Sequence, residues 1–185
     1  MTQGSQAKTL FKIGLMAAFA TLAFVGTTVI RVPIPATGGY FNLGDTFVMV
    51  AALLYGPMVG AVVGAVGPAL ADAIGFPQFI LATAVVKGLE GFLVGFIGRR
   101  ENGAAAGKMV LALIAGIAMM VGGYFVFEAV IYPAMGTAMP FFAVTDAKAA
   151  LAEIVPNLLQ GVISAVIAFG ICRVFVRGSG QRPER

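Results

Sequence analysis

Histidine is absent from this sequence of 185 residues, and cysteine occurs once, at Cys172. A single cysteine excludes a disulfide framework and any multi-cysteine metal or redox motif. Without histidine, a Ser-His-Asp triad and a His-ligated zinc or haem site are excluded as well. The sequence therefore predicts no catalytic site of these kinds, no bound metal and no cofactor.

Charged residues are also scarce. They make up 11% of the chain, against about 25% in an ordinary soluble domain, whereas 59% of the residues are hydrophobic and the mean hydropathy is +0.97. This composition indicates an integral membrane protein in contact with lipid, with one all-α domain over residues 1–185 and about five to seven helices. The net charge of +4 comes from short basic clusters beside apolar segments, which is typical of membrane orientation and argues against a nucleic-acid partner.

Six segments are predicted to cross the membrane. Their approximate bounds are residues 10–30, 42–55, 58–75, 78–98, 109–132 and 149–176. Residues 31–41 hold two prolines and a Gly-Gly pair, which predict a structured loop. Residues 132–148 form the longest connection, a length typical of a lid or binding loop. Nine of the twelve basic residues fall on the side of the termini, which predicts that both termini are cytoplasmic.

The fourth span carries two charges near its centre, Lys87 and Glu90. Burying a charge at that depth costs several kcal/mol unless it is paired or faces a wet cavity. Ala84 and four glycines share one face of the same helix, which permits the close approach of another helix. We expect the charged flank of this face to line a crevice. The alternative is an i,i+3 ion pair between Lys87 and Glu90 that only fixes helix packing.

The last span has one polar face along three helical turns. Glu153, Asn157, Gln160 and Ser164 follow one another at i, i+4, i+7 and i+11, and the other faces are apolar. In a helix surrounded by lipid, such a face must turn toward the protein interior or water. It predicts either a ligand-binding surface or a ladder of interhelical hydrogen bonds.

Three other groups of polar residues lie near the same ends of their spans. Asn42 and Asp45 have the spacing of a helix cap with an acidic third residue, and the alternative is ligand contact. Asp72 lines a pocket mouth or sits among lipid headgroups. Glu128 lies between two tyrosines four residues away on either side, in a binding face or an interfacial belt. The predicted substrate-binding residues are Tyr40, Asn42, Asp45, Asp72, Lys87, Tyr124, Glu128, Glu153, Asn157 and Gln160.

These polar groups converge on the outer half of the predicted bundle, whereas the inner halves are apolar. In a channel or symmetrical carrier, polar residues would line a path through the whole thickness of the membrane. We therefore predict a cup that is open to the outside and binds a small polar molecule. Acids outnumber Lys87, which favours a neutral or cationic heterocycle. Aromatic residues suited to stacking on a ring are Tyr40, Phe41, Phe76, Phe79, Tyr124, Tyr132, Phe141 and Phe142.

Small residues form a surface on the first span. Gly14, Ala17, Ala18 and Thr21 share one face near its N-terminal end. Such a surface permits close docking of another helix, either from a partner or from within the protein.

Several motifs together resemble one family, the substrate-binding S components of energy-coupling factor (ECF) vitamin transporters. The motifs are GGYFNLGD at residues 38–45, ALAD at 69–72 after a run of glycines, and KGLEG at 87–91, within six predicted spans. The resemblance covers nearly the whole chain. It implies a multi-pass protein of the prokaryotic cell membrane that binds a vitamin or precursor, such as hydroxymethylpyrimidine or pyridoxine, at the outer face.

The resemblance also implies partners. An S component associates with a transmembrane coupling subunit and two cytoplasmic ATPases, and no nucleotide-binding P-loop is present in this chain. The family docks its coupling subunit through an Ala-x-x-x-Ala motif, where this chain has Gly14-x-x-x-Ala18 and Ala17-x-x-x-Thr21 instead. Two alternatives come from other classes: an intramembrane enzyme that uses Asp72, Glu90 or Glu128, and a multimeric channel or scaffold.

Overall fold

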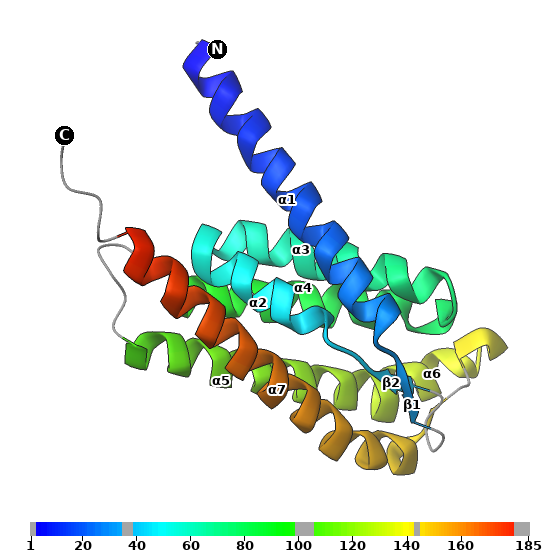
Figure 1. Ribbon diagram of the computed structural model, residues 1–185. Helices are drawn as coiled ribbons and strands as arrows, with labels where there is room; N and C mark the ends of the chain where they lie inside the picture. The colour runs from blue at the N-terminus through cyan, green and yellow to red at the C-terminus, as the bar shows by residue number, and fades with distance from the viewer. Residues whose placement is uncertain (1–2, 35–38, 99–105, 143–144, 180–185) are drawn as a thin grey trace, which may run out of the picture.

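The computed structural model describes residues 3–34, 39–98, 106–142 and 145–179, and it is almost entirely helical. The helical elements are α1 (Gln3–Val29), α2 (Gly44–Tyr55), α3 (Pro57–Ala73), η1 (Pro77–Phe79), α4 (Ile80–Gly98), α5 (Ala106–Val126), η2 (Phe127–Ile131), α6 (Tyr132–Gly136), η3 (Pro140–Phe142) and α7 (Ala147–Ser179). Each of the six predicted spans therefore coincides with a helix. The described helices form an elongated bundle from which α1 projects (Figure 1).

Four helical segments are long and apolar enough to cross a membrane. They are Gly4–Val29, Pro77–Gly98, Ala106–Gly136 and Ala147–Phe175. Helices α2 and α3 are also apolar but have only 12 and 17 residues, against about 20 for a full crossing. Helix α2 is a central element of the bundle, because nine of its 12 residues are buried.

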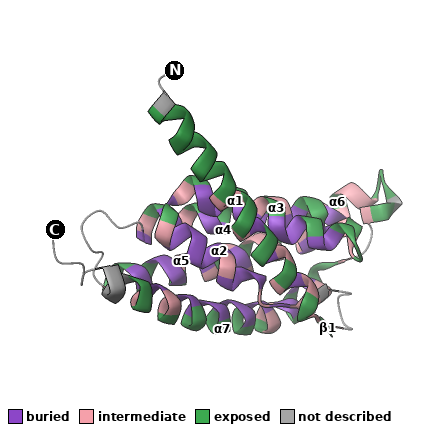
Figure 2. Ribbon diagram, turned by 45° about the horizontal axis from the view of Figure 1, so that its top comes forward, coloured by how far each residue is buried: buried purple, intermediate pink, exposed green. Residues whose placement is uncertain are grey.

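Figure 2 shows exposed positions along the outward faces of the helices, and many of these positions carry large apolar side chains. Exposed side chains on α5 and α7 include Leu111, Ile114, Leu151 and Val166, with exposed fractions between 57 and 67%. In water such a surface would be unfavourable, whereas lipid tails solvate it. The distribution of side chains thus fits a bilayer as the surrounding solvent.

Glycines bring α3 and α4 into close contact. A Cβ atom added at Gly64 would lie 2.0 Å from the Lys87 carbonyl oxygen, and one at Gly91 would lie 2.1 Å from the Gly60 carbonyl oxygen. The predicted glycine face of α4 therefore meets glycines of α3. Their contact holds the backbone of Lys87 against α3 and so fixes the position of this residue in the bundle.

The loop after α1 is a small β-hairpin, which adds a strand pair to the predicted all-α fold. Strands β1 (Val32–Ile34) and β2 (Gly39–Phe41) pair antiparallel, with Val32 opposite Phe41. Arg31 anchors the hairpin by donating hydrogen bonds to the carbonyl oxygens of Ala71, at 2.6 Å, and Thr27, at 3.2 Å. The predicted structured loop thus lies over the same end of the bundle as the end of α3.

Candidate functional site

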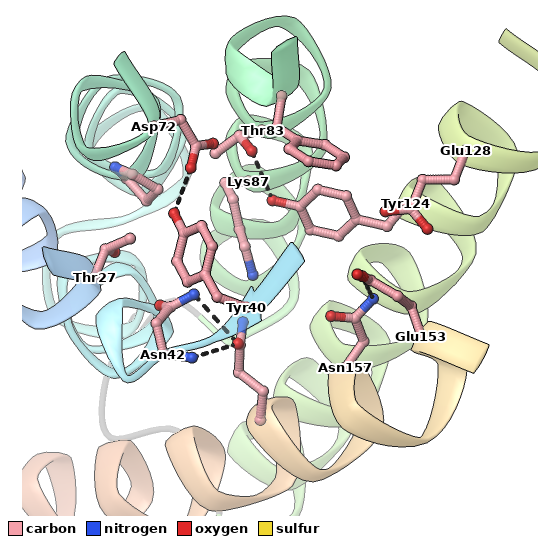
Figure 3. Close-up of a pocket in the computed structure, with 13 residues that line it drawn as sticks. Thr27, Tyr40, Asn42, Asp72, Thr83, Lys87, Tyr124, Glu128, Glu153 and Asn157 are labelled. Atoms are coloured by element: carbon pink, nitrogen blue, oxygen red, sulfur yellow. Dashed lines mark hydrogen bonds between the residues drawn. The ribbon is translucent and has the colours of Figure 1, made fainter. Parts of the chain in front are cut away.

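A polar cavity lies between the hairpin, α3, α4, α5 and α7 (Figure 3). The space open to water-sized molecules amounts to about 40 Å³, which is room for a few waters. Its lining residues are Thr27, Tyr40, Asn42, Pro68, Asp72, Phe79, Thr83, Lys87, Tyr124, Glu128, Glu153, Asn157 and Gln160. Elements distant in sequence thus converge on one small polar space, the arrangement typical of a ligand site.

The cavity gathers nine of the ten residues that the sequence predicted for substrate binding. The exception is Asp45, which is fully buried beneath the cavity. Three lining residues were not predicted: Thr27, Pro68 and Thr83. Thr83 lies one turn before Lys87 on α4, so the polar face of that helix carried a signal for it, whereas nothing in the pattern of α1 pointed to Thr27.

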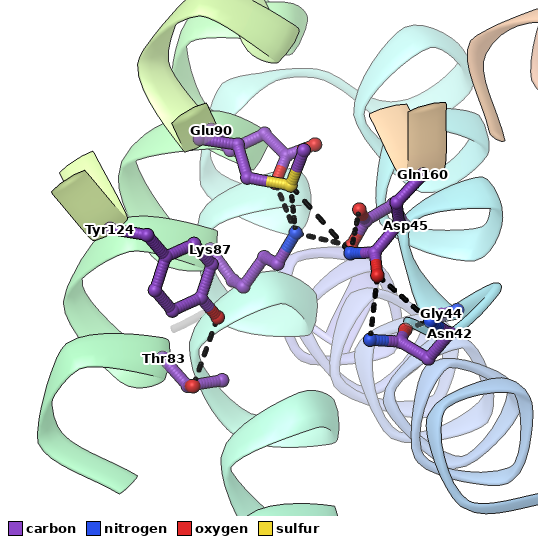
Figure 4. A network of polar contacts seen from close by, with 9 residues as sticks. Asn42, Gly44, Asp45, Thr83, Lys87, Glu90, Tyr124 and Gln160 are labelled. Carbon is purple, nitrogen blue, oxygen red and sulfur yellow. Dashed lines mark hydrogen bonds and ion pairs between the residues drawn. The ribbon is translucent and has the colours of Figure 1, made fainter. Parts of the chain in front are cut away.

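Below the cavity, Lys87 is held between two acids (Figure 4). Its ammonium nitrogen lies 2.5 Å from Asp45 Oδ1 and 3.1 Å from Glu90 Oε2. The side chains of Lys87, Asp45 and Glu90 are all at most 2% exposed to solvent. The two predicted roles of Lys87 therefore coexist, because its side chain lines the cavity and its charge is paired. The Lys87–Asp45 contact also joins α4 to α2.

Gln160 connects the hairpin end to this ion-pair network. Its Oε1 accepts hydrogen bonds from the Asn42 backbone N–H at 2.8 Å and from Asn42 Nδ2 at 3.2 Å. Its Nε2 donates to Asp45 Oδ2 at 2.8 Å. One amide on α7 thus satisfies groups on the segment before α2 and on α2 itself, and it closes the cavity on that side.

The predicted helix cap at Asn42 and Asp45 is wrong. Helix α2 begins at Gly44, its cap position is Leu43, and no side chain caps the helix. Asn42 Oδ1 instead accepts a hydrogen bond from the Gly44 N–H at 2.9 Å, and the Asp45 carboxylate turns toward Lys87 and Gln160. A buried ammonium attracts a carboxylate more strongly than the first turn of its own helix does.

On the α3 side, Tyr40 donates a hydrogen bond to Asp72 Oδ1. Asp72 is 1% exposed, so it belongs to the bundle interior and not to a headgroup region. The Arg31 guanidinium lies 4.7 Å from the Tyr40 ring centroid, against its face. Burial and the adjacent Asp72 carboxylate raise the pKa of the Tyr40 phenol above its ordinary value, so the phenol remains a donor.

On the opposite side, α5 changes from α- to π-helix at Phe127–Ile131, and Glu128 lies in this turn. A π-turn adds a residue to the helical repeat and is frequent at functional sites. Thr145, which lies just before α7, donates a hydrogen bond to the Glu128 carbonyl oxygen at 3.0 Å. One turn earlier, the Tyr124 hydroxyl lies 3.0 Å from Thr83 Oγ1 and so ties α5 to α4.

Two carboxyl groups meet where α5 and α7 face each other across the cavity. Glu128 and Glu153 are adjacent, and their exposed fractions are 1 and 5%. Asn157 Nδ2 donates to Glu153 Oε2 at 3.3 Å. Among the described residues, Glu128 Oε2 has no hydrogen-bond partner. This side of the cavity therefore presents hydrogen-bond acceptors to whatever occupies it. Ser164, the last member of the predicted polar face, is buried beyond the cavity.

An aromatic cluster covers the same end of the bundle. Tyr132 is fully buried, and its ring centroid lies 5.6 Å from that of Phe142 and 6.0 Å from that of Phe79. Its hydroxyl accepts a hydrogen bond from the Ala82 N–H at 3.3 Å. The long connection before α7 thus packs on the start of α4 through aromatic rings. Tyr132, which the sequence placed on the face of Glu128, supports the cavity without lining it.

The far end of the bundle is apolar. Its core is made of residues from α2, α4, α5 and α7, which include Leu53, Val94, Leu113, Ala168 and Cys172. All five are at most 4% exposed. The cavity is therefore confined to one end of a helical bundle with an apolar outer surface, which defines the class of a membrane-embedded protein that binds a small polar ligand from one side.

The chain belongs to the family of ECF-type riboflavin transporter S components, whose sequence profile matches residues 5–176. It is 37% identical over 147 residues to a Pyrococcus woesei protein described as "Uncharacterized protein in gap 3'region", covering 80% of this chain and 89% of that one. It is also 27% identical over 127 residues to the thiamine precursor transporter HmpT of Lactococcus lactis subsp. cremoris, covering 68% of this chain and 71% of that one.

Family membership and the apolar helices identify a multi-pass membrane protein that serves as a vitamin-type substrate-binding subunit of a transporter. The family is a transporter component and not an enzyme, which excludes the alternative of an intramembrane enzyme using Asp72, Glu90 or Glu128. The resemblance drawn from GGYFNLGD and KGLEG is confirmed.

Proposed function

We propose that this protein captures a small heterocyclic vitamin or vitamin precursor at the outer face of a prokaryotic cell membrane and delivers it for ATP-driven uptake. It acts with a transmembrane coupling subunit and two cytoplasmic ATPases, and it forms a single domain of six spans with both termini in the cytoplasm. The excess of basic residues on the side of the termini supports this orientation.

The observation that carries the proposal is the polar cavity at one end of the bundle. Thirteen residues line it, and the core at the other end of the bundle is a cluster of apolar side chains. A binding subunit needs such a closed floor, because the ligand must be retained until partners move it. The hairpin on one side and the aromatic cluster around Tyr132 on the other cover the cavity.

The size of the cavity supports a single-ring ligand. With about 40 Å³ open to water-sized molecules, a single ring requires modest displacement of Tyr40 and Tyr124, whereas a three-ring flavin requires a much larger rearrangement of the packed helices. HmpT, the relative from Lactococcus lactis, is described as a transporter of a thiamine precursor. We therefore favour a substituted pyrimidine or pyridine over riboflavin.

Native mass spectrometry of the purified full-length protein tests the proposal directly. We expect a co-purified ligand with the mass of a single-ring heterocycle, and calorimetry with hydroxymethylpyrimidine, pyridoxine and riboflavin to give submicromolar binding for a single-ring compound. Matched titrations in a Lys87→Ala variant should show weaker binding. If none of the three compounds binds and no small molecule is retained, the proposed function is wrong.

A further inference from the structure

The charges around the cavity are unevenly distributed. Three carboxyl groups line it, those of Asp72, Glu128 and Glu153, against one ammonium, that of Lys87. Lys87 is already paired with Asp45 and Glu90 below the cavity. Its positive charge is therefore balanced by two acids other than those that line the cavity.

The acids on the two sides of the cavity have different surroundings. Asp72 accepts a hydrogen bond from the Tyr40 hydroxyl. Glu128, by contrast, is 1% exposed, and its Oε2 has no hydrogen-bond partner among the described residues. A buried carboxyl oxygen without a partner is unfavourable, so a ligand that supplies a donor to it gains affinity.

The neighbour of Glu128 strengthens this preference. The carboxyl group of Glu153 lies beside it, and two adjacent carboxylates in a buried place repel each other unless a proton or a positive group comes between them. Asn157 donates to Glu153 from the next turn of α7 and so fixes the direction of that carboxyl group. The π-turn that holds Glu128, tied to Thr145, fixes the other.

The residues around the pair suit an organic group better than a metal ion. Hard cations take about six oxygen ligands or more, whereas the described residues contain no group of three or more His, Cys, Asp or Glu side chains arranged to hold a metal. The rings of Tyr124 and Phe79 also line the cavity and offer faces for a planar ring. The pair thus shares the cavity with aromatic side chains.

We propose that the Glu128–Glu153 pair recognises a hydrogen-bond-donating or cationic nitrogen group on the ligand ring, such as an amino group beside a ring nitrogen, and so selects amino-substituted heterocycles. This inference rests on the proposed function and names its substrate class. The amino group donates to the carboxyl oxygens, while the ring packs beside Tyr124. Figure 3 shows Tyr124, Glu128 and Glu153 on one side of the cavity.

Two probes of the same shape isolate this contact. One is 4-amino-5-hydroxymethyl-2-methylpyrimidine, and the other is its 4-oxo counterpart, in which an acceptor replaces the exocyclic donor and the adjacent ring nitrogen carries a hydrogen. In calorimetry with the full chain in lipid nanodiscs, we expect the amino compound to bind at least about tenfold more tightly, because the oxo group cannot donate a hydrogen bond to Glu128 Oε2. Equal affinities, or tighter binding of the oxo compound, would overturn the inference without any mutation.

Glu128→Gln provides the second arm. Glutamine keeps one acceptor oxygen, but an NH2 group replaces the other oxygen, so the side chain loses its charge and one acceptor and can donate to an oxo group. We expect affinity for the amino compound to fall about tenfold or more and affinity for the oxo compound to stay within about threefold. Glu153→Gln should change the preference in the same direction if Glu128→Gln does not fold. Equal weakening of both probes would assign Glu128 a structural role only.

Asp146→Asn is the matched control. Asp146 is exposed at the same end of the molecule, and its Oδ1 accepts a hydrogen bond from the Ala149 N–H at the start of α7, a role that asparagine also fills. The substitution removes one negative charge without reaching the cavity, so both affinities should stay within about twofold.

If pyridoxine or riboflavin binds tightly and the amino compound does not, the inference falls and the proposed function stands. If no heterocycle binds, both fall.

Discussion

Helices α5 and α7 face each other at both ends of the bundle, but through different chemistry. At one end they present Glu128 and Glu153 to a polar cavity. At the other end they contribute Ala112 and Ala168 to the apolar core, and both alanines are fully buried. In the proposed function, the same pair of helices binds a ligand at one end and only stabilises the bundle at the other.

The difference between the two ends shows how the fold tolerates a site whose buried charged groups are destabilising. Buried carboxyl and ammonium groups destabilise a bundle unless their partners are held in place. Here the partners come from neighbouring helices, and the glycine contact between α3 and α4 fixes the backbone of Lys87. The apolar end and the glycine contact therefore provide the rigidity that the polar end requires.

The Lys87→Met variant should have the largest effect on the polar end, because it leaves Asp45 and Glu90 without their shared cation. We expect the free energy of unfolding in detergent to fall by about 3 to 5 kcal/mol. Adding Glu90→Gln should restore part of the loss, because one buried acid is then neutral. A loss below about 1 kcal/mol would mean that the network does not need its cation.

Gly64→Ala tests the contact between α3 and α4. The new Cβ would lie 2.0 Å from the Lys87 carbonyl oxygen, so the helices must separate. We expect the free energy of unfolding to fall by about 1 to 3 kcal/mol, measured by thermal or denaturant unfolding. Gly122→Ala is the control, since nothing lies within 4 Å of its Cβ position and alanine favours helix. Similar losses in the two variants would refute a special role for Gly64.

Asn157→Ala and Ser164→Ala compare two positions on the polar face of α7. Asn157 lines the cavity and donates to Glu153, whereas Ser164 is buried beyond the cavity and its Oγ has no hydrogen-bond partner among the described residues. We expect Asn157→Ala to weaken ligand binding by about 1 to 3 kcal/mol and Ser164→Ala to leave it unchanged, both by calorimetry. Equal effects would show that the whole face serves packing.

Ala18→Leu should have the smallest effect on the purified protein. Gly14, Ala17, Ala18 and Thr21 are all exposed on α1, so a larger side chain at position 18 has room among the described residues. We expect binding and stability to stay unchanged, and uptake by cells to fall because partner docking is blocked. Thr9→Leu, exposed on another face of α1, is the control. Loss of binding in the purified Ala18→Leu variant would place this surface inside the protein.

Much of this architecture could be predicted from the sequence because bilayers impose simple rules. Long apolar segments predicted α1, α4, α5 and α7, and shorter apolar segments predicted α2 and α3. A charge in such a segment must find a partner or a cavity, and this rule singled out Lys87 and Glu90. The helical period of the polar residues on α7 likewise predicted that Glu153, Asn157 and Gln160 share one buried face.

Other features depend on contacts between distant segments. The sequence indicated that Asp45 begins a helix but not that Lys87 lies within reach of it. Thr27 lines the cavity only because α1 ends beside the hairpin. The π-turn at Glu128 has no pattern of its own in the sequence, since it adds one residue to a continuous apolar helix. Such features follow from tertiary packing, which a local pattern does not encode.

Thiol labelling tests most directly that the polar end faces outward. In a Cys172→Ala background, a membrane-impermeant reagent would be added to intact cells carrying Asp146→Cys, at the polar end, or Lys108→Cys, at the apolar end; both positions are exposed. We predict that Asp146→Cys reacts in intact cells and Lys108→Cys reacts only after permeabilisation. The reverse pattern, with the cavity end protected and position 108 labelled from outside, would contradict a cavity that binds its ligand from the exterior.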